Sequence, residues 1–156
     1  MTFYVLLNQI TTLFLSLNLL TTLSFNEEVT SYMYGGSKEE VFFELTNGQK
    51  TLVLKPKRKD MGSNLLVMTK RGKYYFDLKY DEINSHQFLE IRDGAINSSF
   101  KVKKETNDFA LYEGTSSIMF VNKKANQVIV NGKTVQTKEY FSLGVPLLLG
   151  QERILN

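Results

Sequence analysis

Residues 51–80 read TLVLKPKRKDMGSNLLVMTKRGKYYFDLKY and carry the clearest secondary-structure signal of the chain. The last eight, Lys73–Tyr80, alternate between two faces. One face carries Tyr74, Phe76, Leu78 and Tyr80, and the other carries Lys73, Tyr75, Asp77 and Lys79. A period of two is typical of a strand with one face buried. This segment therefore predicts a half-buried β-strand.

Working outward, short apolar segments recur with turn residues between them. Strands are predicted at residues 39–45, 50–55 and 64–70, and in the second half at 98–104, 109–112, 117–121, 127–130, 134–136 and 145–149. Turn signals separate them, among them Asn47-Gly48, Arg71-Gly72 and Asn131-Gly132. A strand every 8–12 residues is the spacing of β-sandwiches and barrels. The sequence predicts an all-β fold of small β-sandwich units.

Two β-domains are expected, at residues 27–81 and 87–156. The polar segment DEINSHQ, residues 81–87, joins them, and residues 81–89 have room for one or two helical turns. In the first domain we expect a core of Val41, Phe43, Leu52, Leu54, Leu66, Met68, Phe76 and Leu78. His86 is interpreted as a solvated residue of the join.

The first 25 residues contain no charged side chain, although the whole chain has 19 Lys and Arg and 16 acidic residues. Residues 13–23 are largely apolar, and small residues follow. This pattern predicts a secretory signal peptide at residues 1–25, although the basic residues that usually begin one are missing. An uncleaved hydrophobic anchor or a buried hydrophobic helix are the alternatives.

Catalytic and metal-binding patterns are absent from the sequence. The chain has no Cys and one His, so thiolate chemistry is excluded and a histidine-rich metal site is not available. Neither a nucleophile motif nor a phosphate-binding or dinucleotide-binding motif occurs. We expect no enzymatic activity and no cofactor.

The strongest charge cluster consists of Lys55, Lys57, Arg58 and Lys59. It predicts contact with an anionic polymer, lipid headgroup or acidic partner, or else a soluble charged connection between strands. The net charge of +3 is modest for a nucleic-acid binder, and no aromatic residues alternate with these cations. Direct nucleic-acid binding is therefore not expected. Separately, Tyr32, Tyr34, Tyr74, Tyr75 and Tyr140 are candidates either for an interface or for burial within a sheet.

Residues 50–80 resemble the N-terminal domain of TrbG/CagX-type subunits of bacterial type IV secretion (conjugation) channels. The matching pieces are Leu54-Lys55-Pro56, the segment Ser63–Thr69, the basic turn Lys70-Arg71-Gly72 and the segment Tyr74–Leu78. The same order of strands and turns occurs in the N-terminal domains of secretins and pilus-formation proteins. The resemblance covers about residues 28–81.

The resemblance implies a noncatalytic structural subunit in the periplasm of a Gram-negative bacterium, associated with the outer membrane. The expected partners are other channel subunits, further copies in a homo-oligomeric ring and a small outer-membrane lipoprotein. Residues 87–156 match the family's C-terminal domain only loosely. The alternative function is an exported β-domain that binds a glycan or anionic polymer through the four cations.

Overall fold

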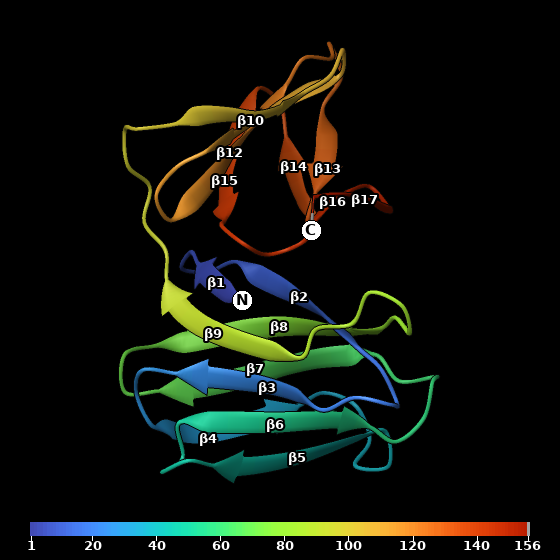
Figure 1. Cartoon of the computed structure of the whole chain (residues 1–156). Helices are drawn as coiled ribbons and strands as arrows, with labels where there is room; N and C mark the ends of the chain where they lie inside the picture. The colour runs from blue at the N-terminus through green and yellow to red at the C-terminus, as the bar shows by residue number, and fades with distance from the viewer. Residues whose placement is uncertain (156) are drawn as a thin grey trace. The chain divides into compact units, whose positions relative to one another are not determined.

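The computed structural model describes residues 1–155, whose strands form four sheets (Figure 1). The predicted all-β fold is confirmed, because the described residues contain strands, turns and loops and no helix. The chain divides into two compact units. The first consists of residues 1–2 and 10–92, and the second of residues 3–9 with the residues from 93 onward. Asn156, the last residue of the second expected domain, lies outside the described residues.

The first unit is a β-sandwich, with strand orders β1-β9-β3-β6-β5 in one sheet and β2-β8-β7-β4 in the other. Strand β1 begins in this unit and continues into the second. The strands are β1 (Thr2–Val5), β2 (Ile10–Leu15), β3 (Thr21–Phe25), β4 (Val29–Tyr34), β5 (Val41–Thr46), β6 (Thr51–Pro56), β7 (Ser63–Thr69), β8 (Lys73–Tyr80) and β9 (Phe88–Asp93).

The predicted separate segment at residues 1–25 is not evident, because these residues form β1, β2 and β3. Strand β2 pairs in parallel with β8, and β3 lies between β6 and β9. Leu13, Leu15 and Leu23 are fully buried. The apolar, charge-free composition that suggested a signal peptide is also the composition of strands buried inside the sandwich. The expected boundaries at 27 and 81 differ from the observed unit for the same reason, since β2, β3 and β9 join it through long-range pairing.

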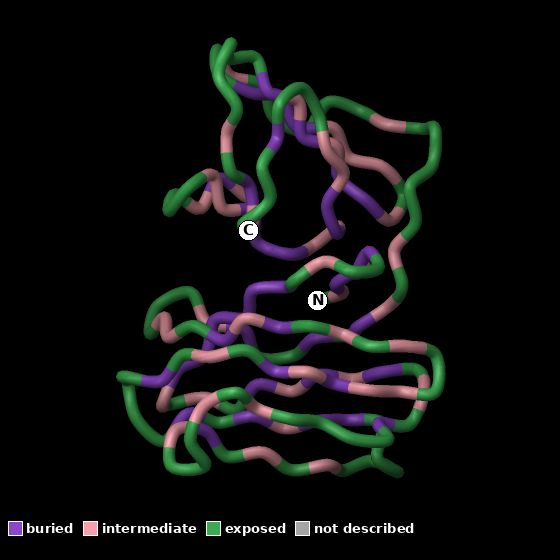
Figure 2. The backbone as a smooth tube through the Cα atoms, turned by 180° about the vertical axis from the view of Figure 1, so that it is seen from behind, coloured by how far each residue is buried: buried purple, intermediate pink, exposed green. Residues whose placement is uncertain are grey.

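Strand β8 has the alternation predicted for it. Phe76 and Leu78 are fully buried, whereas Lys73 and Lys79 are exposed. Aromatic contacts connect the two sheets, as Tyr74 of β8 packs on Phe25 of β3 with ring centroids 5.3 Å apart. Burial is concentrated in the strands, while many turns are exposed (Figure 2).

The predicted core is correct except in β5 and β7. Leu65 and Val67 point into the sandwich, and the expected core residues Leu66 and Met68 lie on the outer face, half-buried. Four apolar residues follow one another here, so a period of two cannot identify the inward face. Phe43 is only half-buried, since it belongs to edge strand β5 and packs against Tyr34 of edge strand β4.

The second unit contains two four-stranded sheets, ordered β10-β11-β12-β15 and β14-β13-β16-β17. Both contribute to one core, in which Phe109 stacks on Phe120 at 5.6 Å and Val130, Phe141 and Leu147 are buried. The strands are β10 (Lys101–Glu105), β11 (Phe109–Glu113), β12 (Ser117–Asn122), β13 (Val128–Val130), β14 (Lys133–Val135), β15 (Lys138–Ser142), β16 (Leu147–Leu149) and β17 (Glu152–Leu155).

Two predicted Asn-Gly turns form as expected. Asn131 and Gly132 connect β13 to β14 as a two-residue turn with φ of 48° and 77°. Both values lie in the left-handed region, which Asn and Gly adopt with the least strain. Asn47-Gly48 also adopts positive φ, within the longer connection between β5 and β6.

Candidate interaction site

The four predicted cations lie on one connection of the first unit. Lys55 is on β6, and Lys57, Arg58 and Lys59 follow in the loop between β6 and β7. Three of them have partners. Lys57 donates from Nζ to the Lys38 carbonyl at 3.0 Å, and Lys59 lies 3.5 Å from the Glu82 carboxylate.

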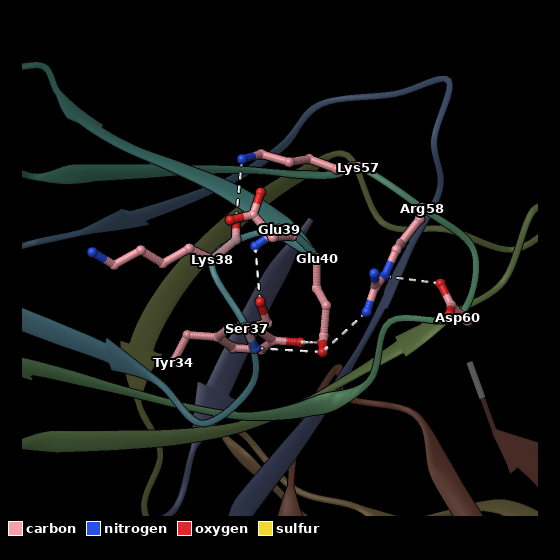
Figure 3. A network of polar contacts seen from close by, with 8 residues as sticks. All are labelled: Tyr34, Ser37, Lys38, Glu39, Glu40, Lys57, Arg58 and Asp60. Carbon is pink, nitrogen blue, oxygen red and sulfur yellow. Dashed lines mark hydrogen bonds and ion pairs between the residues drawn. The ribbon is translucent and has the colours of Figure 1, made fainter.

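Arg58 belongs to a polar network centred on Glu40 (Figure 3). Its guanidinium lies 3.0 Å from Asp60 and 3.7 Å from Glu40. The Glu40 carboxylate also accepts a hydrogen bond of 2.6 Å from the Tyr34 hydroxyl and one of 3.4 Å from the Ser37 backbone N–H. The network joins the end of β4 to the loop that follows β6.

Hydrogen bonds set the protonation of this network. Donation from Tyr34, followed by donation from the Ser37 N–H, lowers the pKa of Glu40 below its usual value of 4.5. Burial raises the pKa of Tyr34 well above its ordinary value, and the hydrogen bond to Glu40 adds to the rise. At neutral pH the pair is therefore a carboxylate and a neutral phenol.

These contacts reduce the number of positive charges in the cluster that are free to bind an anionic ligand. Glu40, Asp60 and Glu82 contact Arg58 and Lys59, while Lys57 is bound to a carbonyl. Lys55 is exposed opposite Phe42 of β5, and its ammonium makes no ion pair within residues 1–155. The geometry favours a charged connection that fixes two loops over an open basic patch.

His86 is buried, with 6% of its surface exposed, so its interpretation as a solvated residue is wrong. The Phe14 backbone N–H donates to His86 Nδ1 at 3.0 Å, and the His86 backbone N–H donates to the Phe14 carbonyl at 2.7 Å. Acceptance at Nδ1 requires that nitrogen to be unprotonated. The imidazole and the backbone N–H of His86 together thus take the place of a neighbouring strand beside β2, a role that a lone His in a polar segment did not indicate.

The outer face of the β2-β8-β7-β4 sheet is apolar along one row. Ile10, Tyr75, Leu66 and Met33 are directly opposite one another across its four strands. Of the five tyrosines considered for an interface, Tyr75 and Tyr32 are exposed. Tyr34, Tyr74 and Tyr140 are half-buried against Phe43, Phe25 and Phe100 respectively.

Neither a metal cluster nor a membrane-spanning helix is found in the described part of the chain. Residues 1–155 bring together no group of three or more His, Asp or Glu side chains suited to hold a metal ion. No helix long and apolar enough to cross a bilayer occurs among them.

No protein-family model matches the chain, and no curated protein matches it significantly.

Proposed function

We propose that the chain is a noncatalytic structural subunit of an envelope-spanning secretion or conjugation channel. In this proposal it forms a periplasmic ring near the outer membrane and contacts other channel subunits. The observation that carries it is the resemblance over residues 50–80. Its pieces coincide with structural elements, since Lys55-Pro56 ends β6 and the segments Ser63–Thr69 and Tyr74–Leu78 lie on β7 and β8.

The mechanism would be geometric. A ring subunit contributes surfaces that fit its neighbours, and β-sandwiches provide them as exposed sheet faces and edge strands. The first unit has both, in the apolar row that ends at Met33 and in the open edge of β4. Neither surface requires a reactive side chain.

Export in this proposal has to preserve residues 2–25. Cleavage after residue 25 would remove β2 and β3 and with them the fully buried Leu13, Leu15 and Leu23. The loss of two internal strands exposes the core, and a small domain has little stability in reserve. The periplasmic form is therefore expected to begin before β2.

Fractionation of the native bacterium, combined with affinity purification of a tagged chain, tests the proposal. We expect the chain in the outer-membrane fraction, in a large assembly with other channel subunits and a small lipoprotein. N-terminal sequencing should find residues 10–25 retained. A chain confined to the cytoplasm and purified without channel subunits would refute it.

A variant separates this function from the alternative of a glycan-binding or anionic-polymer-binding module. Lys55→Gln combined with Lys57→Gln, Arg58→Gln and Lys59→Gln removes the cationic cluster. A channel subunit keeps its assembly, because the proposed contacts come from strands. A polymer-binding module instead loses affinity, and the salt dependence of its binding disappears.

A further inference from the structure

The edge strands differ in how they avoid uncontrolled pairing. Four sheets have eight edges, and five of the edge strands, β5, β10, β14, β15 and β17, carry at least one charged side chain. Charge on an edge strand disfavours pairing with another chain. Strand β10 shows this most clearly, with Lys101, Lys103 and Lys104 among five residues and an irregular register between Val102 and Lys104.

The other three edge strands, β1, β2 and β4, carry no charge. Hydrogen bonds from elsewhere in the chain close two of them. In the second unit, Tyr4 of β1 exchanges backbone hydrogen bonds of 2.8 and 3.1 Å with Leu143. In the first unit, residues 81–86 close β2 through the Phe14–His86 pair and a 3.0 Å bond from the Asp81 N–H to the Leu15 carbonyl.

Strand β4 is uncharged, and its edge is open at Tyr32 and Tyr34. The Gly35 N–H donates to the Asn64 carbonyl at 2.8 Å, so the backbone groups of Gly35, and of Met33 two residues earlier, point toward β7. The groups of Tyr32 and Tyr34 alternate with these and point away from β7. At the start of the strand the Val29 N–H donates to the Gln49 carbonyl at 2.8 Å, and the register with β7 is irregular between Val29 and Ser31. Beyond that point no backbone partner of Tyr32 or Tyr34 is found on this side within residues 1–155.

The apolar row of the outer face also ends at this edge. Met33 is its last member and is 72% exposed, the largest exposed fraction in the row. On the inner face the rings of Tyr32 and Tyr34 pack on Phe43, at 5.5 and 5.4 Å between centroids. Strand β4 is therefore fixed by ring contacts on its inner face, while part of its edge and its outer face are exposed. This arrangement suits the addition of another strand.

We propose that the open edge of β4 pairs with β4 of a second copy, antiparallel and about a two-fold axis at Met33. Tyr32 of one copy then lies opposite Tyr34 of the other, and the two pairs exchange four backbone hydrogen bonds. Met33 lies opposite Met33 of the second copy, and the apolar row continues into the same row of that copy. The result is a continuous eight-stranded sheet.

Charge and register favour a second copy as the occupant. An uncharged strand brings no like charges against itself. Shifting the register by two residues would place Met33 opposite Ser31 or Gly35 and interrupt the apolar row.

The inference concerns the same edge of β4 as the channel proposal, but it is tested on the purified chain alone, without other channel subunits. Sedimentation of the full chain over a range of concentrations should show a monomer–dimer equilibrium. Met33→Lys places two ammonium groups face to face and should weaken the dimer by roughly tenfold or more. Val102→Lys is the matched control, since Val102 is 61% exposed on edge strand β10, and it should leave the dimer intact.

Mixing two variants tests the symmetry. Met33→Lys and Met33→Glu should each be mainly monomeric, whereas an equal mixture should form a heterodimer, because the two side chains meet only in the proposed register. A wild-type chain that stays monomeric at high concentration would overturn the proposal and leave the edge to a different protein. A dimer unaffected by Met33→Lys would overturn it as well.

Cross-linking gives a second readout that does not depend on affinity. The chain contains no Cys, so Met33→Cys introduces a single thiol. Directly opposite residues of a non-hydrogen-bonded antiparallel pair have Cα atoms about 4.5 Å apart, within the range of a disulfide. Under mild oxidation this variant should form a covalent dimer much faster than Val102→Cys. Equal rates would contradict the proposed register.

Discussion

Strands β2 and β4 are the two edges of one four-stranded sheet, and neither carries a charged side chain. They differ in whether the rest of the chain covers their free backbone groups. Strand β2 is closed by residues 81–86 of its own chain, with His86 as its principal partner. Strand β4 is covered only at its first residue, where the Val29 N–H donates to the Gln49 carbonyl, and it ends an apolar row at Met33. Because unpaired edges invite association, the comparison supports the proposal that the β2 edge serves folding and the β4 edge serves recognition.

The largest difference between the two edge strands should come from placing an aspartate on each of them. Leu13→Asp places a carboxylate in the core, since Leu13 is fully buried, and should cost roughly 4 kcal/mol or more and unfold the first unit. Met33→Asp should change the stability of the monomer by about 0.5 kcal/mol or less, because its side chain is exposed. Urea denaturation of dilute protein measures both. Similar losses would show that β4 is not an independent, exposed edge.

Substitution of His86 should expose the closed edge of β2. His86→Ala leaves the buried Phe14 N–H without its acceptor and should cost about 2–3 kcal/mol. His86→Asn is the matched variant, because its side-chain oxygen can occupy the position of Nδ1 and recover part of the loss. Amide hydrogen exchange measured by NMR should show faster exchange of the Phe14 N–H in His86→Ala. Unchanged exchange would mean that His86 does not close β2.

A smaller effect should come from the network that holds the end of β4. The pKa of Glu40 is lowered in the folded state, so its contribution to stability is present above about pH 4.5 and is lost as the pH falls through the folded value. Below pH 4.5 the wild-type Tm should therefore fall more steeply than that of Glu40→Gln. Tyr34→Phe removes the main cause of the shift, and its pH profile should move toward that of Glu40→Gln. Parallel profiles for all three proteins would contradict this role.

How far the sequence predicts the structure depends on the range of the interactions. Strand β8 and the Asn131-Gly132 turn follow from local patterns, and both are observed where they were expected. The prediction of the inward face of β7 was wrong, because apolar residues on both faces remove the alternation that identifies the core. The same residues, Leu66 and Met68, are part of the outer surface that the pattern could not reveal.

The candidate site was predicted only in part. The four cations were found from their spacing, but the ion pairs of Arg58 and Lys59 involve carboxylates from other elements or from the far side of the loop, Glu40, Asp60 and Glu82. His86 gave no signal at all, since its role depends on Phe14, which is 72 residues away in the chain. Hydrogen bonds between distant segments leave no local periodicity.

The sequence by itself determined the fold class, most strands after residue 38 and the tight turns, because these depend on alternation and on backbone preferences of neighbouring residues. Only the tertiary structure shows that residues 2–25 contain the strands β1, β2 and β3, since a charge-free apolar run is equally suited to a core and to export. It also decided which edges are closed. Edge closure depends on which distant groups meet, as at Phe14 and His86. The open part of β4 becomes visible only when no backbone partner of Tyr32 or Tyr34 is found on the side away from β7 within residues 1–155.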